Sequence, residues 1–112
     1  MNTQPPISDR ARRLMDESVV WDAHSCLPIK AGVDCSDLAR HRASGIDYVS
    51  INVGMDFNPV GQISRVIATF RAFLLSRPAE YALVGTVDEV KDHVRRNIET
   101  FAPGRTLTVH HA

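Results

Sequence analysis

Short apolar runs and longer segments of helical spacing alternate along the chain. The short runs lie at residues 19–21, 46–53 and 81–84, and their β-branched and aromatic side chains are typical of buried strands. Helices are predicted after these strands, at residues 37–43, 59–76 and 87–101. The helix at 59–76 is the clearest, because its apolar residues recur at positions i, i+3, i+4 and i+7. The alternation of strand and helix predicts right-handed βαβ units around a parallel sheet.

Capping residues mark where several of these helices begin or end. Ser8 precedes a short predicted helix at residues 9–17 and can cap its first turn. Thr86 and Glu89 have the spacing of a reciprocal capping box at the start of the last predicted helix. Gly45 follows the helix at 37–43, and glycine adopts the left-handed conformation needed there at little cost.

Size and charge limit the partners that the chain can have. It has 112 residues with 13 basic and 13 acidic side chains, so its formal net charge is +0. Because there is neither net positive charge nor a basic run interleaved with aromatic residues, no nucleic-acid partner is expected. No apolar run approaches the roughly 18 residues of a membrane span, so no membrane association is expected.

The chain is expected to form a single domain over residues 1–112 with irregular ends. Residues 1–7 predict a disordered lead and residues 103–112 an irregular tail. Two cysteines and a polar amino-terminal segment predict a reducing, cytoplasmic location. Three parallel strands would leave two open sheet edges, whereas such sheets are normally longer or closed into a barrel. The sequence therefore predicts part of a larger structure, with self-association through the exposed sheet edges.

The most distinctive chemistry follows the first predicted strand. His24 and Cys26 lie two positions apart, with Asp22 just before them. At the carboxyl end of a barrel strand both side chains would face the mouth where active sites are built. Imidazole, thiolate and carboxylate are all zinc ligands. The alternative interpretation is a histidine that only forms hydrogen bonds in a loop and a cysteine that packs as a small hydrophobe.

The other histidines and the second cysteine have simpler interpretations. His41 and His93 lie on predicted helices beside charged residues and are expected to face solvent. His110 and His111 are expected to bind adventitious metal at most. Cys35 is expected to be inert, and no disulfide between the two cysteines is expected in a reducing compartment.

Two polar residues after the second strand would lie at the same end of the sheet as His24. These residues, Asp56 and Asn58, could contact a substrate, although turn chemistry explains them equally well. The sequence contains no phosphate-binding glycine loop, dinucleotide fingerprint, nucleophile elbow or paired CxxC motif. Kinase, dehydrogenase and α/β-hydrolase functions therefore have no support.

Residues 19–28, VVWDAHSCLP, carry a family resemblance. They resemble the first strand of the membrane dipeptidase (renal dipeptidase) family, which reads as an apolar run followed by Asp-Gly-His-Asn-Asp-Leu-Pro. Residues 37–54 and 83–90 resemble its second βα unit and the segment before its next helix, so the similarity covers roughly residues 9–91. The resemblance implies a (β/α) TIM-type barrel, of which this chain holds about three βα units. It also implies metal-dependent hydrolysis of dipeptides with two zinc ions.

By this resemblance, the metal ligands are His24 and, where the family has an Asp, Cys26. A thiolate is a softer and bulkier ligand than a carboxylate, which favours a different metal occupancy. The bridging Glu and two further His ligands of the family come later in its chain, and nothing after Lys91 matches them. Because such barrels take about 250 residues, the chain is expected to be a truncated amino-terminal part that is inactive alone. The catalytic and substrate-binding residues stay unassigned.

A different hypothesis needs no metal. The chain could be a noncatalytic α/β module that binds a small molecule or a partner chain through its unpaired sheet edges. The two hypotheses differ in one measurable property, which is whether His24 is needed to retain zinc.

Overall fold

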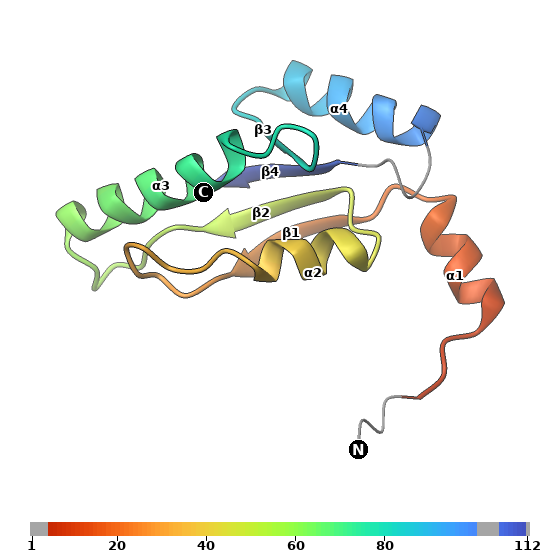
Figure 1. Ribbon diagram of the computed structural model, residues 1–112, viewed down its shortest axis with the longest axis horizontal. Helices are drawn as coiled ribbons and strands as arrows, with labels where there is room; N and C mark the ends of the chain where they lie inside the picture. The colour runs from red at the N-terminus through yellow and green to blue at the C-terminus, as the bar shows by residue number, and fades with distance from the viewer. Residues whose placement is uncertain (1–4, 101–105, 112) are drawn as a thin grey trace.

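Strands and helices alternate along the chain, as the hydrophobic pattern predicts. The computed structural model describes residues 5–100 and 106–111. The elements are α1 (Asp9–Asp16), β1 (Trp21–Cys26), α2 (Asp37–Ala43), β2 (Tyr48–Asn52), α3 (Val60–Leu75), β3 (Tyr81–Leu83), α4 (Val87–Thr100) and β4 (Leu107–His111) (Figure 1). The strands form one parallel sheet, so the predicted α/β class is confirmed. Within the described ranges, no helix combines the length and hydropathy that crossing a membrane requires.

The strand order of the sheet is β1-β2-β4-β3, which is not the order along the chain. β4 lies between β2 and β3 and pairs in parallel with both, so that Thr108 is level with Tyr48 and Leu107 with Tyr81. The prediction of an irregular tail at residues 103–112 is therefore wrong where β4 runs. Thr106, just before β4, is in neither a helix nor a strand. Residues 103–105 and 112 lie outside the described part of the chain. β1 and β3 are the two edges of the sheet.

Alternate residues of the central strands point to two different faces of the sheet. Val49, Ile51 and Val109 are fully buried in the core cluster that includes side chains of α2 and α3. Tyr48 and His110 point the other way and line a cavity together with side chains of α4. We call these two sides the α2/α3 face and the α4 face.

The strand order explains why α4 covers a face of its own. The chain moves in one direction across the sheet from β1 to β2 to β3, so right-handed connections place α2 and α3 on the same face. The connection from β3 back to β4 runs in the opposite direction and places α4 on the other face. In a closed (β/α) barrel all helices lie outside the sheet. The described residues instead form an open sheet with helices on both faces (Figure 1).

The apolar stripe of α3 forms the centre of the core. Val66, Phe70 and Leu74 are buried, and Ile63 and Ile67 pack against them at the margin. These residues are spaced three and four apart and therefore share one side of the helix. The predicted core-facing stripe of the helix at 59–76 is confirmed.

Most of the predicted helix ends are also confirmed. The Ser8 hydroxyl accepts a hydrogen bond from the backbone of α1 at 3.1 Å. Thr86 Oγ1 accepts from the Glu89 backbone N–H at 3.2 Å, whereas the Glu89 carboxylate accepts from the Gly85 N–H at 3.0 Å, one residue earlier than in a standard capping box. Gly45 has the expected positive φ of 92° after α2. Of the predicted disordered lead, residues 1–4 lie outside the described chain and the rest form no helix or strand.

β1 begins later than predicted and contains the polar residues that were expected to follow it. The strand is not at residues 19–21 but runs from Trp21 to Cys26, because the parallel pairing with β2 extends over those residues. The register between the two strands shifts between Asp22 and Ser25, which marks a local irregularity. His24 and Cys26 are therefore part of the edge strand itself.

A buried polar network ties α4 to the sheet. Asp47, directly before β2, is buried, and its carboxylate accepts hydrogen bonds from Val20 N at 2.8 Å and Asn97 Nδ2 at 3.2 Å. Asn97 Nδ2 also donates to the Thr106 carbonyl at 2.6 Å, and Asn97 Oδ1 accepts from the Thr106 N–H at 3.1 Å. The network therefore joins the beginnings of three strands to one helix.

Candidate functional site

The two predicted metal ligands lie side by side near the carboxyl end of β1. His24 Nε2 and Cys26 Sγ are 3.6 Å apart, and both residues are exposed. Cys26 is level with Asn52 of β2. The neighbour of Asn52, Ile51, points to the α2/α3 face, so Asn52 and Cys26 point to the α4 face. The structure therefore brings together the pair that the sequence singles out, on the α4 face of the sheet edge.

The separation within the His24–Cys26 pair suits a zinc ion. Zinc binds imidazole nitrogen at about 2.0–2.1 Å and thiolate sulfur at about 2.3 Å, and a tetrahedral angle then separates the two donor atoms by about 3.6 Å. The observed distance between Nε2 and Sγ has this value. In the structure the same contact is a hydrogen bond between the Cys26 thiol and the His24 ring, so the distance fits both a hydrogen bond and a shared zinc ion.

The structure brings together only two of the residues that the sequence suggests as ligands. Among the described residues, no group of three His, Cys, Asp or Glu side chains is arranged to hold a metal ion. Asp22, the third ligand that the sequence suggests, is level with Val49 and so points to the α2/α3 face. Its Oδ1 accepts a hydrogen bond from the His24 backbone N–H at 3.1 Å, which supports the local turn of the strand.

The two polar residues of the loop after β2 do not join this pair. Asn58 Oδ1 accepts a hydrogen bond from the Met55 N–H at 2.8 Å, which is the turn chemistry considered for it. Asp56 is exposed in the same loop. Nothing in these contacts points to a role in substrate binding.

His41 does not face solvent, as the sequence predicted, but lies half-buried between α2 and β1. Its Nδ1 lies 2.8 Å from the Asp37 carbonyl, and because a carbonyl only accepts, Nδ1 carries the proton. Nε2 then accepts a hydrogen bond from Ser25 Oγ at 3.0 Å. The helical spacing contains a signal for this burial, because His41 follows the fully buried Leu38 by three residues.

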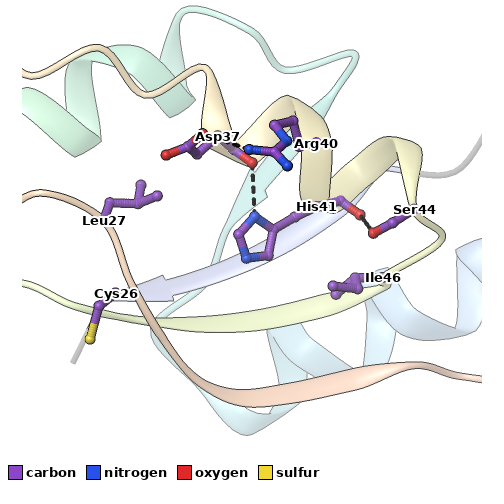
Figure 2. Close-up of a pocket in the computed structure, with 7 residues that line it drawn as sticks. All are labelled: Cys26, Leu27, Asp37, Arg40, His41, Ser44 and Ile46. Carbon is purple, nitrogen blue, oxygen red and sulfur yellow. Dashed lines mark hydrogen bonds and ion pairs between the residues drawn. The ribbon is translucent and has the colours of Figure 1, made fainter. Parts of the chain in front are cut away.

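A cavity of about 500 Å³ opens beside His41. It is lined by Cys26, Leu27, Asp37, Arg40, His41, Ser44 and Ile46. Figure 2 shows the His41 ring below α2 and the Cys26 sulfur directed away from it. The Ser25–His41 hydrogen bond and the His24–Cys26 pair therefore face opposite sides of the same strand.

The remaining histidines lie on α4 and β4. His110 and His111 are adjacent in β4, with ring centroids 6.3 Å apart. Burial lowers the pKa of His111, and the positive charge of Arg71 lowers it further. His93 is half-buried, so its predicted solvent exposure is wrong, and burial followed by the charge of Arg96 lowers its pKa as well.

Cys35 behaves as the sequence predicts for an inert residue. It lies in the core with only 1% of its surface exposed, and it is a free thiol, as is Cys26. Burial raises the pKa of the Cys35 thiol, and the nearby Asp34 charge raises it further. Both effects oppose formation of the reactive thiolate. The two cysteines thus differ sharply in environment, which makes one a natural control for the other.

Comparison with other proteins assigns no function to these residues. The function has to be argued from the residues themselves, chiefly from the His24–Cys26 pair. No protein-family model matches the chain, and neither curated proteins nor solved structures contain a significant match to it.

Proposed function

We propose that the chain supplies zinc ligands to a metallodipeptidase-like hydrolase, with His24 and Cys26 binding one ion. The observation that carries this proposal is the 3.6 Å separation of His24 Nε2 and Cys26 Sγ, which is the donor separation of a tetrahedral zinc site. Dipeptides are the substrates that the resemblance of residues 19–28 implies. A bound zinc ion would supply a water of lowered pKa and polarise the scissile carbonyl.

The residues of this chain hold the ion and do not complete the site. Two ligands leave half of a tetrahedral coordination sphere open, and catalytic zinc sites usually have three protein ligands. The hydrogen bond from the His24 backbone N–H to Asp22 Oδ1 holds the local backbone on which the imidazole is carried. We therefore expect the chain alone to bind zinc and to hydrolyse no dipeptide.

A (β/α) TIM-type barrel is proposed on the basis of the first unit only. β1 and β2 are adjacent and parallel, and α2 lies on one face between them, as in the opening unit of a barrel. In such a barrel β3 would pair with β2, and β4 takes that place here. The proposal therefore requires β3 and β4 to be rearranged in the complete hydrolase.

A noncatalytic α/β module is the second candidate, and a different observation favours it. With β4 between β2 and β3, the sheet is open and doubly wound. Helices already lie on both of its faces, so no further strands are needed for this arrangement. Its edges, β1 and β3, would then bind a partner chain or a small molecule.

Zinc retention tests the first candidate against the second. The chain is purified under reducing conditions, incubated with zinc and desalted, and its metal content is measured. We expect His24→Ala and Cys26→Ala to lower the retained zinc to background, and Cys26→Asp, which restores the ligand type of the family, to retain zinc. Cys35→Ala is the matched control and should leave the zinc content unchanged.

Two results would contradict this proposal. Equal zinc content in the original chain and in His24→Ala would remove the ligand assignment and favour the noncatalytic module. Dipeptide hydrolysis by the zinc-loaded chain would contradict the expectation that the chain is inactive alone, and a hydrolysis assay with and without a chelator measures this directly.

A further inference from the structure

The His24–Cys26 pair combines an incomplete ligand set with an open position in the fold. β1 has a neighbouring strand on one side only, so its other side is a sheet edge. His24 and Cys26 are exposed on this edge strand, and Trp21 at its beginning is 52% exposed. Closed zinc sites in proteins are almost always four-coordinate. Two further ligands for a closed site must therefore come from outside the described chain.

A second copy of the chain can supply the same two ligands. In a two-fold symmetric dimer, each surface meets its own copy, so that residue i contacts residue j and residue j contacts residue i. If two β1 strands lie antiparallel about an axis beside Ser25, His24 of each copy is opposite Cys26 of the other. Directly opposite residues in such a pair have Cβ atoms about 4.5–5.5 Å apart. The two imidazoles and two thiolates then lie on one face of the joined strands.

We propose that zinc joins two copies of this chain through a Cys₂His₂ site formed by His24 and Cys26 of each copy. This inference rests on the proposed zinc binding by the pair and adds its partner, a second copy of the chain. Two thiolates and two imidazoles are a common ligand set of structural zinc sites. Such a site has no open position, so zinc held in the dimer cannot bind the water that the proposed hydrolysis requires, and the dimer is a form of the chain separate from the hydrolase.

The surroundings of the pair favour this association. The formal net charge of the chain is +0, so no long-range repulsion opposes the approach of two copies. An exposed edge strand presents unpaired backbone groups to a second strand. The zinc ion adds a specific bond at this edge, and it should decide whether the two copies associate.

The test measures mass and metal content together. The chain is kept in a reducing agent, and light scattering after size exclusion gives its mass with zinc and with a chelator. We expect zinc to double the mass, the chelator to reverse this, and the dimer to contain one zinc ion for two chains. Cobalt in place of zinc should give a thiolate-to-cobalt absorption band with twice the intensity per metal ion of a site with one thiolate.

Four variants separate metal-dependent pairing from other kinds of dimer. His24→Ala and Cys26→Ala should stay monomeric with zinc, while Cys35→Ala should behave like the original chain. In a dimer of Cys26→His, all four zinc ligands would be imidazole nitrogens. This variant should still dimerise with zinc and lose the thiolate-to-cobalt band, and its dimer cannot be a disulfide.

The failures of this inference and of the proposed function look different. A monomer that retains one zinc ion per chain would overturn the shared site and leave zinc binding by the pair intact. A dimer that persists in the chelator, or in His24→Ala, would overturn the inference because its formation needs no metal. A chain that retains no zinc would overturn both.

Discussion

The two faces of the sheet differ in how polar their contacts are. On the α2/α3 face the centre of the contact area is apolar, with Val49, Phe70 and Leu107 completely buried, and the polar Ser25–His41 contact lies at its margin beside β1. On the α4 face the contacts include the buried Asn97 amide and a stack of Trp21 on Tyr48, with ring centroids 3.6 Å apart. The comparison indicates that one face supplies most of the stability, whereas the other carries polar groups and exposed side chains.

The α4 face also contains a buried hydroxyl group without a hydrogen-bond partner. Thr108 points to the α4 face and is fully buried, and its hydroxyl has no hydrogen-bond partner among the described residues. Leaving a buried hydroxyl unpaired costs about 1–3 kcal/mol. If the comparison of the two faces is correct, substitutions on the two sides should change the free energy of unfolding by different amounts and, at Thr108, with different sign.

The largest effect is expected for Phe70→Ala on the α2/α3 face. Removing a fully buried phenyl ring leaves a cavity and should lower the free energy of unfolding by about 3–5 kcal/mol. Phe57, which is 83% exposed, provides the control, since Phe57→Ala should change it by less than about 0.5 kcal/mol. Urea unfolding followed by circular dichroism measures both. Similar values for the two variants would contradict the assignment of the core to this face.

A smaller loss is expected for Asn97→Ala on the α4 face. The variant removes the hydrogen bonds to Asp47 and Thr106 and should cost about 2 kcal/mol, because it leaves buried partners unpaired. Arg95→Ala is the matched control on the same helix. Its side chain forms an exposed ion pair with Asp92 that is worth about 0–1 kcal/mol. If Asn97→Ala cost no more than this control, the network would not hold α4 to the sheet.

Thr108→Val should have the opposite sign. The two side chains have nearly the same shape, and valine removes the buried hydroxyl that lacks a partner. We expect the free energy of unfolding to rise by about 1 kcal/mol. Thr108→Ser, which keeps the hydroxyl and removes the methyl group, is the control and should be destabilising. A loss of stability in Thr108→Val would show that the hydroxyl does contribute to the fold.

The smallest effect is a dependence of stability on pH at His111. Burial and then Arg71 lower its pKa in the folded chain, whereas in the unfolded chain the pKa has its ordinary value of 6.5. Below that pH the unfolded chain therefore binds more protons than the folded one. The contribution of the neutral imidazole to stability is thus present above pH 6.5 and is lost as the pH falls towards the lowered pKa.

His111→Gln should therefore make stability less sensitive to acid. Urea unfolding of the variant and the original chain from about pH 7.5 to about pH 5.5 measures the difference. His93→Gln makes the same comparison for α4, since burial lowers the pKa of His93 in the same direction. Identical pH profiles for all three chains would contradict the influence of burial on these groups.

Local patterns in the sequence predict the helices and two of the strands, β2 and β3, whereas the first predicted run meets β1 only at Trp21. The stripe around Phe70 and the caps at Ser8 and Thr86 depend on neighbours within one or two turns, so they can be derived from spacing alone. β4 could not be derived in this way. Its partners are Tyr48 and Tyr81, far away in the sequence, and its short run of alternating residues gives no local sign of a central strand.

The candidate site was predictable in part for the same reason. Two residues at i and i+2 share a side of an extended strand, so the proximity of His24 and Cys26 follows from their spacing. The boundaries of β1 did not follow, because an edge strand tolerates exposed polar residues and therefore lacks an apolar pattern. The spacing from Leu38 places His41 on the buried side of α2, but its hydrogen bond to Ser25 depends on where α2 lies against β1, which is a tertiary property.

The position of β4 has a consequence for how the chain is made. Of the four described strands it is the last along the chain, yet it lies between two strands that precede it. During translation, the β1–β2 pair and β3 can emerge from the ribosome without a strand to join them. Contacts between distant segments form slowly because a long loop must close first. A nascent chain should therefore stay exposed to proteases and chaperones until residues 107–111 have left the exit tunnel.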